Sequence, residues 1–239
     1  MGDYFRGVVL YISSADQFYN AYEVLVNKIY RYNLNNDRKD IVFDIGMNNG
    51  DATLFFLQDE NVEKVYGYEP FGETFQLAKE NLEKFGCKNR YKIFQYGLSN
   101  IDEIREIDFN SAMTCGQSTD YYMRERAYAY YDALGLLDMH DNRRERVEVK
   151  RASGVLESVM KEYPCHNYIL KMDCEGEEYA IIEELNKNKV LGRFHMIMLE
   201  WHHKGYERIA DCLSESGYSY NFIDKEGGMG LIYAQKTGM

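Results

Sequence analysis

The sequence predicts an α/β fold: a doubly wound, mostly parallel sheet whose last strands form an antiparallel hairpin. Three observations support this prediction. An apolar strand, a glycine turn and an apolar helix follow one another over residues 41–57. Further apolar strands then alternate with amphipathic helices along most of the chain. Finally, two strands at 218–223 and 230–235 flank the Gly227-Gly228 turn, which is typical of a hairpin.

Length and composition indicate one domain over residues 1–239 that can bury a full core. With 28 basic and 39 acidic side chains the formal charge is −11, which disfavours nucleic acid as a partner. The five cysteines include no Cys-x-x-Cys pair, no secretory signal is apparent, and no apolar run is long enough for a membrane span. We therefore expect a reduced, cytoplasmic protein.

The first sheet unit begins with the apolar residues Ile41, Val42 and Phe43, a pattern that is typical of a strand buried on both faces. A turn from Gly46 to Gly50 follows. Glycines permit backbone conformations that other residues avoid, and they let a ligand approach the main chain. The unit is therefore the expected start of a nucleotide-binding sheet.

The spacing of this turn discriminates between ligands. A dinucleotide turn needs a middle glycine, but Asn48 stands there, and no Gly-Lys-Ser/Thr follows that would form a phosphate-binding P-loop. Asp44, at the end of the strand, adds a negative charge that suits a sulfonium. The turn therefore favours S-adenosylmethionine as the cofactor.

A second strand, 62–68, ends at Glu69, about 20 positions beyond the turn. A carboxylate there is placed to accept hydrogen bonds from both ribose hydroxyls. Phe71 is then expected along the adenine ring. After a helix at 73–85 and a third strand at 91–96, Leu98 and Ser99 are candidates for the adenine edge by position.

Two regions lie outside the regular alternation. Residues 1–40 form an expected N-terminal helical cap with apolar side chains at helical spacing between 17 and 32: Phe18, Tyr22, Leu25, Val26 and Ile29. Residues 101–166 form an insert, which we expect to act as a lid and substrate element. It holds predicted strands at 103–109 and 146–151 and a helix at 154–162.

The insert also carries a tyrosine-rich segment, 121–137, with tyrosines at 121, 122, 128, 130 and 131. These rings can stack on a sugar or can form core, and helical spacing favours core. The basic cluster of Arg143, Arg144 and Arg146 favours a solvated face over a phosphate site.

The sheet resumes with strands at 167–172 and 194–199, followed by a helix at 206–216. In an open α/β sheet the ligand lies beyond the carboxyl ends of the strands. Five polar residues are predicted to reach such ends and to converge on one crevice: Asp44, Glu69, Ser99, Asp173 and Glu200.

Five segments resemble FkbM-type S-adenosylmethionine-dependent methyltransferases: Asp44–Asp51, Tyr68–Pro70, Gly97–Asn100, Lys171–Glu177 and Leu199–His202. The resemblance implies a Rossmann-like, class I methyltransferase fold, and O-methylation of sugars or other natural-product hydroxyls. It also implies that Asp173 and Glu175 line the reaction site and that the cofactor is held by Asp44, Gly46, Asn48, Gly50 and Glu69. Met47 departs from the small residue usual in this turn, and the insert is not recognisable, so the acceptor is not identified.

For the chemistry we expect in-line transfer of the methyl group to a hydroxyl oxygen, with a base at a strand tip. Asp173 is the first choice for this base and His202 the second, with Glu200 completing the catalytic set. We expect no metal, although Asp173 and Glu200 could alternatively hold a divalent ion. The remaining alternatives are an NAD-dependent sugar oxidoreductase and a catalytically inactive, cofactor-binding partner subunit. Whether the chain forms a homodimer stays open.

Overall fold

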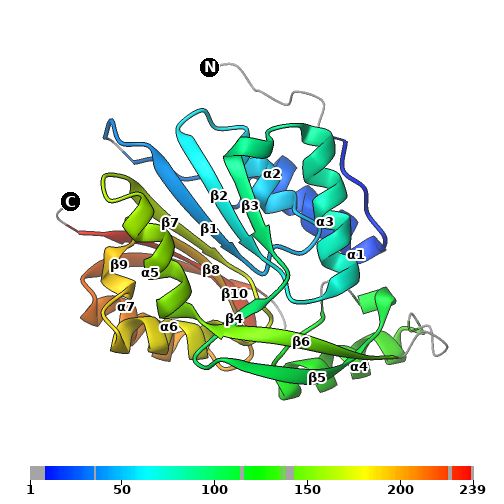
Figure 1. Cartoon of the computed structure of the whole chain (residues 1–239). Helices are drawn as coiled ribbons and strands as arrows, with labels where there is room; N and C mark the ends of the chain where they lie inside the picture. The colour runs from blue at the N-terminus through cyan, green and yellow to red at the C-terminus, as the bar shows by residue number, and fades with distance from the viewer. Residues whose placement is uncertain are drawn as a thin grey trace.

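The computed structural model describes residues 9–34, 36–113, 116–135, 137, 143–225 and 228–237. A seven-stranded sheet forms its centre, in the order β3-β2-β1-β7-β8-β10-β9 (Figure 1). Its strands are β1 (Asp40–Ile45), β2 (Val62–Tyr68), β3 (Tyr91–Phe94), β7 (Asn167–Met172), β8 (Met196–His202), β9 (Tyr218–Lys225) and β10 (Met229–Lys236). Only β10 runs antiparallel to its neighbours β8 and β9, so the predicted fold class is confirmed. Gly227 of the predicted turn lies outside the described residues.

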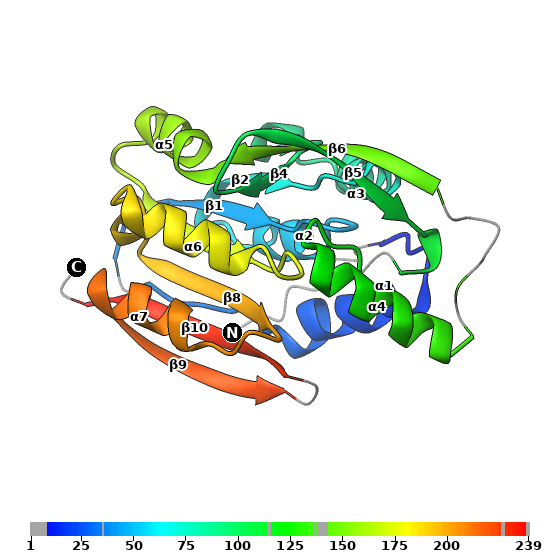
Figure 2. The ribbon, with the colours of Figure 1, turned by 90° about the horizontal axis from the view of Figure 1, so that it is seen from below.

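Helices cover both faces of this sheet (Figures 1 and 2). One layer holds α1 (Ala15–Ala21), the π-helix η1 (Tyr22–Asn27), α2 (Asp51–Leu57) and α3 (Gly72–Phe85), and the other holds α5 (Ala152–Glu162), α6 (Glu178–Lys187) and α7 (Glu207–Glu215). Alternation along β1 sends Phe43 into the core under α5–α7 and Val42 into the core under α1–α3. Short 3₁₀ turns complete the chain: η2 (Lys88–Arg90), η3 (Ser111–Met113) and η4 (Leu191–Arg193).

A second, three-stranded sheet lies beside the first, in the order β4-β6-β5. It consists of β4 (Gly97–Ser99), β5 (Glu103–Phe109) and β6 (Arg143–Arg151), and α4 (Tyr121–Ala133) lies between its last two strands in sequence. Residues 97–99, expected in a loop, are therefore a strand that pairs parallel with β6. Phe71 packs with Phe109 of this sheet, which joins the two sheets.

Only part of the predicted insert, residues 101–166, lies apart from the main sheet. Its helix α5 belongs to the helical layer of the main sheet, where Leu156 and Met160 are fully buried. The part that leaves the main sheet is thus β5, α4 and β6. Residues 114–115, 136 and 138–142 of the insert lie outside the described residues.

The N-terminal helix also differs from the prediction. It ends as a π-helix at Asn27, followed by Lys28 in a left-handed conformation with φ 56°. Leu25 is buried, but Phe18 of α1 and Val26 of η1 are exposed, and the wider π turn changes which side chains of η1 face inward. No helix in the described part of the chain is both long and apolar enough to cross a bilayer.

Candidate active site

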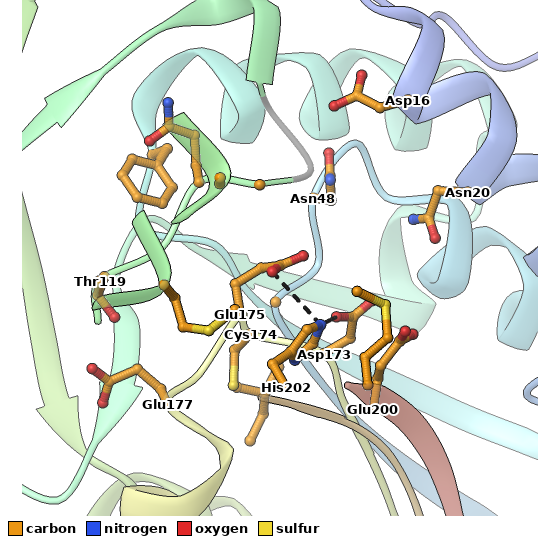
Figure 3. Close-up of a pocket in the computed structure, with 18 of the residues that line it drawn as sticks. Asp16, Asn20, Asn48, Thr119, Asp173, Cys174, Glu175, Glu177, Glu200 and His202 are labelled. Carbon is orange, nitrogen blue, oxygen red and sulfur yellow. Dashed lines mark ion pairs between the residues drawn. The ribbon is translucent and has the colours of Figure 1, made fainter. Parts of the chain in front are cut away.

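A cavity of about 950 Å³ opens at the carboxyl ends of β1, β2, β7 and β8. Its floor includes Gly46, Glu69 and Asp173, which follow these strands, and Glu200, near the end of β8. Side chains from two segments outside the main sheet wall the other side: Asp16, Tyr19, Asn20 and Glu23 from α1 and η1, and Met123, Arg126, Ala127, Tyr130 and Tyr131 from α4. Figure 3 shows Asp173 and Glu200 of the floor and Asp16 and Asn20 of this wall.

The turn after β1 is held tightly against the neighbouring strands. Gly46 has φ 74°, and a Cβ there would lie 1.7 Å from the carbonyl oxygen of Asp173, so no other residue fits. The backbone N–H groups of Gly46 and Met47 both donate to the Tyr68 carbonyl oxygen at 3.1 Å. Gly50 also has a positive φ and begins α2, but it does not line the cavity.

Met47 is accommodated by a second glycine. Its side chain is fully buried, and a Cβ at Gly67 on β2 would lie 2.4 Å from the Met47 sulfur. The large turn residue therefore occupies space that Gly67 leaves open and does not block the cavity. This explains how the departure from the usual small residue is tolerated.

Glu69 lines the cavity from the end of β2, as predicted. One carboxylate oxygen accepts from the N–H of Asn48 and the other from the N–H of Phe71, each at 3.0 Å. A carboxylate has about four acceptor positions, so each oxygen can still accept one ribose hydroxyl. Burial raises the pKa of Glu69 to about 7.

Asp44 does not reach the cavity. It is fully buried, accepts from the Thr53 hydroxyl at 2.6 Å, and lies 3.0 Å from the ammonium of Lys171. Lys171 also donates to the Gly46 carbonyl oxygen at 2.7 Å. The charge of Asp44 is therefore offset by Lys171, and the pair supports the turn from below. A lysine within the apolar strand 167–172 was the sequence signal for this buried partner.

The other predicted cofactor contacts separate into two groups. Asn48, Phe71 and Leu98 line the cavity. Ser99 does not, because its fully buried hydroxyl donates to a carboxylate oxygen of Glu177 at 2.7 Å. Arg105 of β5 pairs with the same carboxylate, so Ser99 supports the loop after β7.

That loop brings carboxylates to the end of β8, in the order Asp173, Glu175 and Glu178. The His202 Nδ1 atom lies 2.9 Å from an oxygen of Glu178, and its Nε2 atom lies 3.6 Å from Glu175 and 3.9 Å from Asp173. Burial alone would lower the pKa of His202, but Glu175, Glu178 and Asp173 together raise it well above its usual value. A protonated imidazole cannot accept a proton, so His202 is a poor choice of base in this arrangement.

Glu200 lies within β8, because this strand continues to His202 by pairing with Met229 of β10. The ammonium of Lys225 lies 3.2 Å from Glu200 and 3.1 Å from Glu23. Burial, together with the nearby Asp173, raises the pKa of Glu200 to about 7. Lys225 and Glu23 had no sequence signal, since their partners are distant in the chain.

The tyrosines of α4 do not form core, so that prediction is wrong. Tyr121, Tyr122 and Tyr130 are exposed, and Met123 is the one buried residue of the described helix. Met123 fits over Gly176, where a Cβ would lie 2.5 Å from its side chain. Tyr131 donates to Asp16 at 2.8 Å and so joins α4 to α1, which Figure 2 shows side by side.

Three cavity residues other than glycine adopt left-handed backbone conformations: Asn48 (φ 49°), Glu175 (φ 53°) and His203 (φ 57°). Such conformations cost on the order of 1–3 kcal/mol where they are strained, and they concentrate at functional sites. All three lie in loops or at strand ends around the same cavity. Their concentration there marks the cavity as the functional region of the fold.

The comparisons with known proteins identify the family of the chain. The family model described as the methyltransferase FkbM domain matches residues 44–220. A search of curated proteins gives no match. Similar solved structures are compared by identity, TM-score, and coverage of this chain and of theirs. The TrmK protein of M. capricolum with S-adenosyl-homocysteine has 13% identity and a TM-score of 0.48, and the match covers 89% of this chain and 67% of that chain. The FkbM methyltransferase of Methylobacillus flagellatus has 14% identity and a TM-score of 0.48, and the match covers 89% of this chain and 47% of that chain.

A human methyltransferase 10 domain containing protein is also similar, with 12% identity, a TM-score of 0.49, and coverage of 96% of this chain and 88% of that chain. The chain spans about half the length of the M. flagellatus protein. The family match covers well over half of the present sequence, and it confirms the predicted family, enzyme class and cofactor. The chain belongs to the FkbM methyltransferase family and is an S-adenosylmethionine-dependent methyltransferase.

Proposed function

We propose that the protein transfers the methyl group of S-adenosylmethionine to a hydroxyl oxygen of a sugar or a related natural product. The proposal rests on one observation: a single cavity joins the turn after β1 and Glu69 to the carboxylates at the ends of β7 and β8. The first end offers a glycine turn and a carboxylate that can accept hydrogen bonds from the ribose hydroxyls of the cofactor. The second offers proton acceptors, which a hydroxyl nucleophile requires.

The wall of the second end supports a polyol acceptor. Tyr19, Tyr130 and Tyr131 line it, and such rings can lie against the apolar face of a sugar. Asp16 and Glu177, which line the same cavity, add oxygens that can accept from hydroxyl groups. The chain carries a formal charge of −11, so a phosphate backbone is disfavoured as an acceptor.

In the proposed mechanism the protein aligns the acceptor oxygen, the methyl carbon and the sulfur. As the O–C bond forms, the C–S bond breaks and its electron pair stays on sulfur, while the hydroxyl proton passes to Asp173. Alignment of this kind can lower the barrier by up to roughly 7–11 kcal/mol. Proton acceptance adds roughly 10²–10⁴-fold in rate. Asp173 remains the first choice of base because its side chain faces the cavity and is 18% exposed.

Two alternatives compete with this proposal. A nicotinamide-dependent oxidoreductase is disfavoured because Asn48 occupies the position where pyrophosphate needs a glycine, and because its N–H already donates to Glu69. A cofactor-binding partner subunit would need no proton acceptor beside the cofactor. Six carboxylates around the acceptor end are unexpected for such a subunit: Asp16, Glu23, Asp173, Glu175, Glu177 and Glu200.

We also propose a reducing, cytoplasmic location. The four cysteines in the described part of the chain, Cys87, Cys165, Cys174 and Cys212, are all free thiols. Free thiols are usual where glutathione keeps cysteines reduced. Cys115 lies outside the described residues.

The test is methyl transfer to a panel of sugars and sugar nucleotides. Asp173→Asn should reduce turnover by roughly 10²-fold or more and leave S-adenosyl-homocysteine affinity within a few-fold. The matched control, Asp211→Asn, changes an exposed carboxylate on α7 and should retain turnover. Unchanged turnover in Asp173→Asn would remove this residue from the mechanism. A stronger melting shift with NAD than with S-adenosylmethionine would favour the oxidoreductase.

A further inference from the structure

The two ring nitrogens of His202 have different surroundings. Nδ1 lies 2.9 Å from Glu178, whereas Nε2 faces the cavity at 3.6 Å from Glu175 and 3.9 Å from Asp173 (Figure 3). The last two distances exceed those of an N–H···O hydrogen bond. A buried nitrogen thus points between two carboxylates without hydrogen-bonding to either. In metal sites, a ligating histidine commonly has its other nitrogen held by a carboxylate in this way.

Glu178 is suited to orient the ring and not to bind an ion itself. It is fully buried, and its two oxygens accept the N–H groups of Cys174 at 3.1 Å and Gly176 at 2.8 Å. With His202 as a third partner, both oxygens are engaged. The carboxylate and the ring are therefore fixed relative to each other, which sets the direction of Nε2.

Asp173 and Glu175 are not paired directly with a lysine or arginine in the described part of the chain, although Asp173 is near enough to raise the pKa of Lys171. Within the described residues, His202 is the only basic side chain within 4 Å of either carboxylate. The neighbouring lysines are paired elsewhere, Lys171 with Asp44 at 3.0 Å and Lys225 with Glu200 at 3.2 Å. Two partly exposed carboxylates and one buried imidazole nitrogen therefore face one point at the acceptor end of the cavity.

We propose that this point binds one divalent cation, which replaces the proton on the Nε2 atom of His202 and is held by that nitrogen and by the carboxylates of Asp173 and Glu175. Ligand bonds of about 2.0–2.2 Å would require Nε2 and the two carboxylates to move closer together, which the partly exposed side chains of Asp173 and Glu175 allow. A mixed nitrogen and oxygen set suits a first-row ion such as Mn²⁺ better than Ca²⁺. The sequence had suggested Asp173 and Glu200, but Glu200 is paired with Lys225.

The role of the ion rests on the proposed methyl transfer, whereas its binding does not. At the acceptor end it would hold the hydroxyl oxygen and make its proton easier to remove. The O–C bond would still form as the C–S bond breaks, with the electron pair left on sulfur. The proton would still pass to the carboxylate of Asp173, which has a second oxygen to accept it.

The first experiment identifies the nitrogen ligand. Mn²⁺ is added to the protein saturated with S-adenosyl-homocysteine, and pulsed electron paramagnetic resonance is used to detect coupling between the ion and a histidine nitrogen. We expect one bound Mn²⁺ per chain with this coupling, and loss of the coupling in His202→Gln. His203→Gln is the matched control, because His203 also lines the cavity and should leave the coupling unchanged.

The second experiment measures Mn²⁺ affinity in variants that keep the cofactor-induced melting shift. Glu175→Gln and Asp173→Asn should weaken Mn²⁺ binding by roughly 10–100-fold. Glu178→Gln should weaken Mn²⁺ binding to a similar degree, although Glu178 is not a ligand, because it orients the His202 ring. Glu23→Gln removes the same charge from the same cavity beside Lys225 and should have little effect. No Mn²⁺ binding by protein that binds S-adenosyl-homocysteine, coupling that survives in His202→Gln, or an equal loss in Glu23→Gln would overturn the proposal. Absence of methyl transfer would contradict the proposed function but not a bound ion.

Discussion

The two ends of the cavity are built in different ways. The cofactor end consists of backbone and of residues close in sequence: Gly46, Asn48 and Glu69 all follow β1 or β2. The acceptor end combines side chains from segments far apart, with Asp16 on α1, Tyr131 on α4 and others on β8 and β9. The first end is held by strand pairing and the second by individual side-chain contacts.

This difference separates tasks that evolve under different constraints. A cofactor of constant shape can be held by main-chain geometry, which tolerates little change. An acceptor can be selected by side chains on elements outside the main sheet, which change without disturbing the core. Mutations at the cofactor end should therefore affect folding and binding strongly, whereas mutations in the α1–α4 wall should have local effects.

The largest effect is expected for Gly46→Ala. The new Cβ would meet the Asp173 carbonyl oxygen at 1.7 Å, and φ 74° is unfavourable for alanine. Overpacking and the backbone conformation together should lower the free energy of unfolding by about 3 kcal/mol or more. Urea unfolding measures this. In the matched Gly50→Ala variant, with φ 86° but contacts no closer than 3.5 Å, the cost should be only about 1–2 kcal/mol. An equal loss of unfolding free energy in the two variants would contradict the close approach of Gly46 to the Asp173 carbonyl oxygen.

The next effect is expected for Glu69→Gln. The amide loses the charge that strengthens the ribose hydrogen bonds, each of which contributes roughly 1.5–3 kcal/mol. We expect S-adenosyl-homocysteine to bind roughly 10–100-fold more weakly, as measured by calorimetry. Glu73→Gln, at an exposed position in the first turn of α3, is the control and should bind normally. Normal affinity in Glu69→Gln would refute the ribose assignment.

The contrast between the ends also explains what the sequence could predict. The cofactor end is local, so strand periodicity and the turn spacing predicted Gly46, Asn48 and Glu69 at the cavity. Asp44 was misplaced because its partner Lys171 lies on another strand. Ser99 was misplaced because residues 97–99 pair with a strand about 50 residues later in the chain.

The acceptor end depends on such distant contacts almost entirely. The contact between Asp16 and Tyr131 joins residues 115 positions apart, and no periodicity encodes it. The tyrosines of α4 follow helical spacing, but that pattern does not distinguish a core face from a cavity wall. The sequence therefore predicted the element and misjudged its surroundings.

A smaller effect is expected from pH, again at the cofactor end. Burial raises the pKa of Glu69 to about 7, and a ribose hydroxyl donates to the ionised carboxylate. Affinity is therefore complete above this pKa and falls as the carboxylate takes up a proton below it. Between pH 8 and pH 6 we expect about a tenfold loss of S-adenosyl-homocysteine affinity. Calorimetry at both values checks this, and Glu69→Gln should lack this part of the pH dependence. A flat wild-type profile would contradict an ionised partner for ribose.

The smallest effect is expected at the acceptor wall, for Tyr131→Phe. This change removes the 2.8 Å hydrogen bond to Asp16 and leaves the ring in place. Its loss should weaken the link between α1 and α4 by about 0.5–1.5 kcal/mol, so amide exchange in α4 should become a few-fold faster while the turn after β1 is unchanged. Hydrogen exchange measured by mass spectrometry tests this. Tyr130→Phe is the matched control, since this exposed ring packs edge-on against Tyr131 on the same helix. Faster exchange at the β1 turn in Tyr131→Phe would mean that the two ends are not independent, because a side-chain contact in the wall would then support the cofactor end as well.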